Sequence, residues 1–193
     1  FVGPINQGSL TLPVTYTSNS PGTDSDGWNV VGNPYPSAID WDAGWVKTRI
    51  SPMIAINDDA AKMFRYYEAG VTDELPNGQI AMGQAFHIRA TGANPVLQIT
   101  ENAKVGVVPE FFREAAPHIP NFVITLSDGK VRDYAYVKVV ADARRTLDDL
   151  DAPKIKNENF GLATVSEDKI GMAINAVDGL ACGMELPLRT AGL

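Results

Sequence analysis

Short runs in which apolar and polar residues alternate follow one another along most of the chain. In QAFHIRA (84–90) and NPVLQIT (94–100), apolar residues recur at every second position, as expected for strands with one buried face. Asp128-Gly129 is a favoured pair for a tight hairpin between two such runs. We therefore predict an all-β fold, an antiparallel β-sandwich of the jelly-roll or immunoglobulin-like type, with about ten or eleven strands. The predicted strands cover 8–17, 27–32, 51–56, 62–68, 84–90, 94–100, 121–127, 131–141, 161–166, 169–176 and 184–189.

Signals for helices are few. SAIDWDAGWVKT (37–48) could begin a helix, because Ser37 is a possible cap and Asp40 follows it three residues later. Gly44 weakens this helix, so one or two turns are expected. EFFREAA (110–116) is a second candidate that ends at Pro117. The fold is thus predicted to contain at most one or two short helices.

Two prolines bracket His118 in AAPHIPN (115–121), which is typical of a linker. We predict a first β-sandwich domain over residues 1–117 and a second β-sandwich unit over 118–193. The sequence leaves open whether the second unit is incomplete.

The composition narrows the classes of partner. The net charge of −7, without any extended run of Lys and Arg, argues against nucleic acid. No run of 18 apolar residues occurs, so a membrane-spanning helix is not expected. The single Cys182 lies in an apolar stretch and is expected to be a small buried side chain rather than half of an internal disulfide.

The segment GWNVVGNPYPSAIDWDAGW (27–45), called here the tryptophan-rich segment, holds all three tryptophans of the chain. Its Asn-Pro-Tyr-Pro stretch forces an extended corner, and its large rings could anchor that corner by being buried. The alternative is a carbohydrate-binding platform. In it, the rings would stack on sugars while side-chain oxygens accept hydroxyl hydrogen bonds, and the candidate ligand-binding residues are Tyr35, Trp41, Trp45, Asp40 and Asp42. A platform requires ring faces that are open to solvent, and an anchor requires that they be covered.

We predict no catalytic residues and no enzymatic activity. Asp40 and Asp42 could in principle form the carboxylate pair of a glycosidase, but any Asp-x-Asp offers that spacing and nothing else in the chain supports it. His87 and His118 lack metal-ligand spacing. The glycine-rich phosphate-binding motifs are missing, so nucleotide cofactors are not implied.

Acidic loops raise the question of structural calcium. Carboxylates gather at 24–27, 57–59 and 148–151, and oxygen-rich loops suit Ca²⁺. The third is the best candidate because its carboxylates crowd and would repel one another without a cation. Asp148, Asp149 and Asp151 are therefore the candidate metal ligands, although acidic turns are usually only solvated.

Several stretches resemble the region upstream of the C-terminal sorting domain in large proteins exported by the type IX (Por) secretion system. GWNVVGNPYPSAIDWD (27–42) resembles that family's G-W-N-L-V-G-N-P-Y-P-S-x-I-D-W motif, and IAMGQAFHIRA (80–90) resembles its I-A-x-G-Q-G-F-F-V-K-A. ITENAKV (99–105), EFFRE (110–114) and the stretch from Asp133 through DDLDAPKIKN (148–157) resemble later elements in the same order. Ala85, His87 and Leu147 depart from the family pattern.

The resemblance implies a β-rich extracellular module with no defined enzymatic activity. We accordingly predict a non-catalytic structural or adhesive module of a secreted, cell-surface multidomain protein. Its expected partners are neighbouring domains or other protomers. Carbohydrate binding, with a polysaccharide as partner, is the alternative.

Overall fold

The computed structural model describes residues 5–18, 25–59, 61–72, 74–75, 78–106, 122–157, 160–181 and 183–191. The chain is all-β, as predicted, and within these residues Glu101–Ala103 forms a short 3₁₀ helix, η2. No helix in the described ranges is long and apolar enough to cross a membrane. The strands are β1 (Leu10–Leu12), β2 (Trp28–Gly32), β3 (Ala38–Asp40), β4 (Trp45–Thr48), β5 (Ile50–Asp58), β6 (Met63–Tyr67), β7 (Gln79–Ile80), β8 (Ala85–Ala90), β9 (Val96–Ile99), β10 (Lys104–Val105), β11 (Phe122–Ser127), β12 (Arg132–Val139), β13 (Ala152–Pro153), β14 (Gly161–Val165), β15 (Gly171–Val177) and β16 (Leu188–Ala191).

The chain forms two compact units. The first is drawn from residues 1–18, 26–56 and 66–118, and the second from 19–25, 57–65 and 119–193. The predicted change of unit within 115–121 lies outside the described residues, as do the candidate helix at 110–116, His118 and Cys182.

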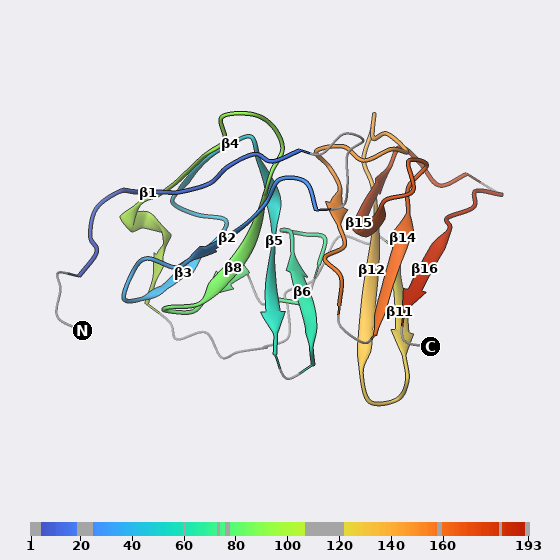
Figure 1. Cartoon of the computed structure of the whole chain (residues 1–193), viewed down its shortest axis with the longest axis horizontal. Helices are drawn as coiled ribbons and strands as arrows, with labels where there is room; N and C mark the ends of the chain where they lie inside the picture. The colour runs from blue at the N-terminus through green and yellow to red at the C-terminus, as the bar shows by residue number, and fades with distance from the viewer. Residues whose placement is uncertain are drawn as a thin grey trace. The chain divides into compact units, whose positions relative to one another are not determined.

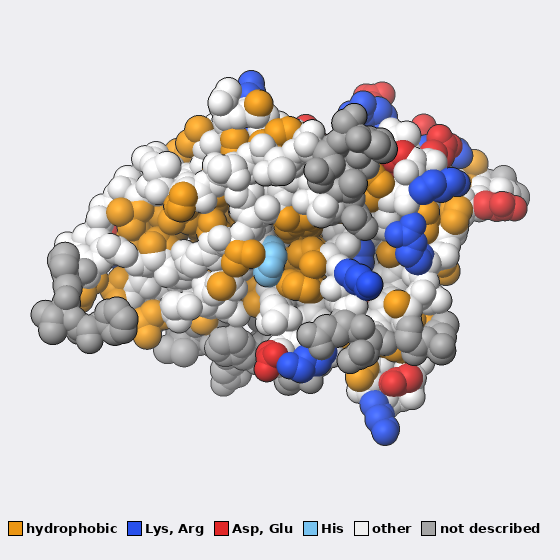
Figure 2. All heavy atoms as spheres, in the orientation of Figure 1, with side chains coloured by type: hydrophobic (Ala, Val, Ile, Leu, Met, Phe, Trp, Pro, Cys, Tyr) orange, Lys and Arg blue, Asp and Glu red, His pale blue; other side chains and the backbone are white. Residues whose placement is uncertain are grey.

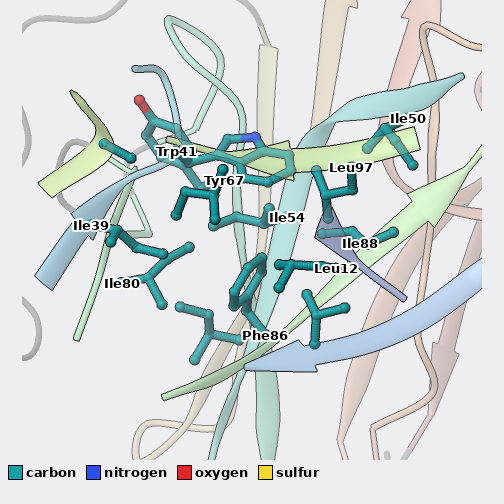
Figure 3. Packing of buried hydrophobic residues seen from close by; sticks show 14 of the residues in the cluster. Leu12, Ile39, Trp41, Ile50, Ile54, Tyr67, Ile80, Phe86, Ile88 and Leu97 are labelled. Carbon is teal, nitrogen blue, oxygen red and sulfur yellow. The ribbon is translucent and has the colours of Figure 1, made fainter. Parts of the chain in front are cut away.

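Three sheets, with the strand orders β2-β8-β5-β6, β1-β9-β4 and β10-β3-β7, are built mainly from residues of the first unit (Figure 1). Side chains from all three meet in one apolar cluster (Figure 3). Leu12 and Leu97 come from the β1-β9 pair, Phe86 and Ile54 from the larger sheet, and Ile39 from β3. Packing between sheets in this way gives the unit its sandwich-like core.

The alternating pattern correctly identified the strands that border this core. In β8, Phe86, Ile88 and Ala90 are fully buried, whereas His87 between them is only partly buried. In β9, Leu97 and Ile99 are buried and Val96 is exposed. Successive side chains of a strand point to opposite faces, so a period of two in the sequence becomes one buried face.

The predicted helix over 37–48 is wrong. The segment instead forms β3, a turn and β4. Gly44 has φ +74°, a left-handed conformation that a helix interior does not allow, and Asp40 Oδ1 accepts a hydrogen bond from the N–H of Asp42 to close the turn. The hydroxyl of Ser37, the supposed cap, is buried and makes no hydrogen bond within the described residues.

The second unit contains one large sheet with the order β11-β12-β15-β14-β16, and β13 also pairs with β15. The pairing of β12 with β15 is parallel, whereas β11 with β12 and β14 with β16 are antiparallel. All seven residues of β15 are buried, as in a strand covered on both faces. This strand is the centre of the second core.

Candidate functional site

The tryptophan-rich segment lies in the first unit, where it runs through β2 and β3 into β4. Tyr35 has 2% of its surface exposed and Trp41 has 0%, while Trp45 is partly buried and packs against the same core. The ring faces of Tyr35 and Trp41 are therefore covered by protein. This arrangement is the one required for an anchor, and these two rings offer no open stacking surface.

Trp41 is the centre of the aromatic packing. Its ring centroid lies 5.0 Å from that of Trp45 and 5.9 Å from that of Phe86, and both pairs of rings are inclined rather than parallel. Its indole Nε1 donates a hydrogen bond of 2.5 Å to the carbonyl of Pro52. The ring is thus held by packing on its faces and by a hydrogen bond at its edge, which satisfies its only polar group.

Lys47 covers the indole of Trp41. Its Nζ lies 3.7 Å from the ring centroid and donates a 2.6 Å hydrogen bond to the carbonyl of Trp41. Burial lowers the pKa of Lys47 to about 8, although the carboxylates of Asp42 and Asp40 act in the opposite direction.

The corner after β2 is held by the side chain of Asn33. Its amide Nδ2 donates to the carbonyls of Ser37, Ala81 and, at longer range, Ile80, and its Oδ1 accepts from the N–H of Tyr35. The prolines on either side of Tyr35 have no N–H to contribute. The buried amide therefore replaces the backbone pairing that this extended corner lacks.

The same segment fastens the chain that precedes it. Asn29 bonds both main-chain groups of Thr15, accepting from its N–H at 2.9 Å and donating to its carbonyl at 2.8 Å. The hydroxyl of Tyr35 donates to the carbonyl of Gly8. These bonds join residues 14 and 27 positions apart in the sequence.

The two aspartates of the segment also have structural partners. The carbonyl of Asp40 accepts a hydrogen bond from Nε1 of Trp45, and its carboxylate closes the turn described above. The carboxylate of Asp42 accepts a hydrogen bond from the hydroxyl of Tyr67. Burial together with this bond raises the pKa of Tyr67.

Gly44 permits a close backbone contact that gives a sharp test. A Cβ added to Gly44 would lie 2.2 Å from the backbone nitrogen of Ala103, and its φ of +74° disfavours any other residue. We expect Gly44→Ala to lower the free energy of unfolding of the first unit by about 3 kcal/mol or more. Urea titration followed by tryptophan fluorescence measures this.

Gly32 is the matched control, because nothing lies within 4 Å of a Cβ added there and its φ is not left-handed. Gly32→Ala should change the same free energy by less than about 1 kcal/mol. Equal losses for the two variants would show that the close approach at Gly44 is not needed.

In the acidic cluster at 148–151, carboxylate oxygens are occupied by backbone N–H groups. Asp148 Oδ1 accepts from Leu150 and its Oδ2 from Arg144, whereas Asp151 Oδ1 accepts from Ala176 and its Oδ2 from Asp148. Asp149 is exposed. Donors that point at all four buried oxygens fit a loop-closing role better than a calcium site, because an N–H dipole repels a cation. Within the described residues, no group of three His, Cys, Asp or Glu side chains could hold a metal ion.

Burial raises the pKa of Asp151 from 3.8 to about 6, more than the backbone hydrogen bonds lower it. The folded state thus binds this proton more tightly than the unfolded chain. The carboxyl group of Asp151 therefore contributes most to stability below about pH 4. This contribution is lost as the pH rises through about 6. At each pH, the free energy of unfolding of the wild type can be compared with that of Asp151→Asn. We expect this difference to shift against the wild type by up to about 3 kcal/mol between about pH 4 and pH 7.

The measurement is chemical denaturation at several pH values, with Asp149→Asn as the exposed control. If the stability difference between the wild type and Asp151→Asn did not vary with pH, Asp151 would not carry the titration.

A buried polar network in the second unit was not predicted. Asp133 is completely buried, and its Oδ1 lies 2.7 Å from Nζ of Lys154. Its Oδ2 accepts hydrogen bonds from the backbone of Leu162 and from the side chain of Asn157. Asp133 is one of three charged residues in the predicted strand over 131–141, so the pattern identifies neither its burial nor its partner.

No protein-family model matches the sequence, and comparisons with curated proteins and with solved structures also find no match.

Proposed function

We propose that the chain is a non-catalytic structural module of a secreted, cell-surface multidomain protein, in which it spaces or joins neighbouring domains or protomers. The observation that carries the proposal is how the tryptophan-rich segment uses its polar groups. The side chains of Asn29, Asn33, Tyr35, Trp41 and Trp45 all donate hydrogen bonds to main-chain carbonyls. In a ligand-binding surface, such donors would instead be available to form hydrogen bonds with the ligand.

These bonds give the module a mechanical character. The chain around Gly8 and Thr15 is tied to β2 and the corner by hydrogen bonds, and β1 between them pairs with β9. Pulling this segment off the unit must break these side-chain bonds in addition to the pairing of β1 with β9. The location at the cell surface rests on the resemblance of residues 27–42 to exported surface proteins.

Force spectroscopy on the full chain, pulled from its two ends, tests the mechanical proposal. We expect Asn29→Ala combined with Tyr35→Phe to lower the rupture force of the first unit, because the bonds to Thr15 and Gly8 are lost. Tyr16→Phe is the control in the same segment, since this side chain is exposed.

Equal rupture forces for the double variant and the control would contradict the proposal. So would saturable binding of a polysaccharide that quenches tryptophan fluorescence, since this would favour a carbohydrate-binding role. An antibody against the module should label intact cells of the source organism if the module is exported.

A further inference from the structure

The second unit contains a cavity of about 250 Å³ on its large sheet, between β14, β16 and the chain that follows β13. Leu162, Ala163 and Ala191 contribute apolar surface to it. The volume is at the small end for ligand sites, so it suits a molecule of a few heavy atoms rather than a drug-sized one.

The charged groups of the cavity are all positive. Lys154, Lys156 and Arg189 contribute to its wall, and the described residues that line it include no acidic side chain. Figure 2 shows Lys and Arg side chains gathered over the part of the second unit that carries β14 and β16. The carboxylate of Asp133 forms an ion pair with Lys154. Lys156 and Arg189 therefore carry the remaining positive charges of the cavity.

The side chain of Arg189 is exposed, and one hydrogen bond orients its guanidinium. Its Nη2 donates a 2.8 Å hydrogen bond to the carbonyl of Lys169, and its Nη1 lies 3.2 Å from where a Cβ on Gly171 would be. A guanidinium has five N–H donors in a planar fork that matches a carboxylate. Fixing it beforehand reduces the ordering cost of binding an anion.

We propose that this cavity binds a small monocarboxylate with a short branched or cyclic hydrocarbon body. The carboxylate would lie at Arg189 and Lys156, and the hydrocarbon part would lie against Leu162, Ala163 and Ala191. An apolar wall next to cations disfavours inorganic phosphate, which offers nothing to bury there. The proposal does not depend on the structural function proposed above.

The test uses isovalerate as the probe on the full chain, with amide chemical shifts and hydrogen exchange as readouts. We expect saturable shifts of β14 and β16 amides at roughly millimolar concentration, and slower exchange along β16. Isovaleramide, which has the same shape without the charge, should bind at least about tenfold more weakly. Inorganic phosphate should also bind more weakly than isovalerate.

Arg189→Gln should weaken isovalerate binding about tenfold to a hundredfold, since a charge-assisted pair is lost. Ala191→Phe, at an exposed position on β16, should fill the cavity and abolish binding even if Arg189→Gln perturbs the strand. Lys130→Gln, an exposed cation outside the cavity, should leave binding unchanged.

Three results would overturn the proposal: no saturable shifts, equal affinity for isovaleramide or phosphate, or unchanged binding by a folded Ala191→Phe variant.

Discussion

Replacing Asp133 with alanine is expected to lower the free energy of unfolding of the second unit by about 3–5 kcal/mol. The change leaves the ammonium of Lys154 buried without its carboxylate. It also removes the acceptor of the Leu162 N–H and of the Asn157 amide. Urea titration followed by amide hydrogen exchange of β14 and β15 measures the loss directly.

A double variant shows how much of this loss comes from the buried charge that Asp133→Ala leaves without its partner. Combining Asp133→Ala with Lys154→Met removes both charges, so much of the lost stability should return. The three tryptophans lie in the first unit, and their fluorescence provides an internal control for it. If Asp133→Ala cost less than about 1 kcal/mol, the network would not be a principal support of this unit.

Replacing Trp41 with alanine is expected to destabilise the first unit by about 3–5 kcal/mol. The largest fully buried side chain among the described residues would be replaced by a cavity beside Trp45 and Phe86, and the carbonyl of Pro52 would lose the indole donor. Trp41→Phe keeps an aromatic ring and should cost less. Denaturant titration followed by circular dichroism measures both variants.

Val46→Ala serves as the control, because Val46 lies on the neighbouring strand β4 and is largely exposed. It should change stability by less than about 1 kcal/mol. A similar loss for Val46→Ala and Trp41→Ala would mean that the indole is not an anchor.

The sequence predicted the fold class well because alternation is a local property. In β8 and β9 it depends only on which residues follow one another, and the buried faces are those that the pattern indicated. The prediction failed at 37–48, where a possible cap at Ser37 and an acidic residue three positions later, Asp40, imitate the start of a helix. The left-handed conformation of Gly44 and its close approach to Ala103 determine the conformation of that segment. Both depend on residues that are far away in the sequence.

The candidate site could be located from the sequence, but the exposure of its rings could not. Whether Trp41 faces water depends on Lys47 and on Pro52 of the next strand, which only the fold brings together. The cluster around Asp148 resembles calcium ligands in sequence, because composition cannot show that backbone N–H groups reach its carboxylates. The pairing of Asp133 with Lys154, 21 residues later, is hidden for the same reason.

The way in which the first unit holds residues 8–15 has a consequence for how this stretch can vary. Asn29 and Tyr35 contact the main chain of Thr15 and Gly8, and the carboxylate of Glu101 accepts from the N–H of Gly8. Main-chain groups are the same in nearly every amino acid. Leu10, Leu12 and Val14 pack against the core, and Gly8 has a left-handed φ of +73°. Apart from these four positions, substitutions along this stretch should therefore be tolerated, and homologues can diverge here without losing the attachment.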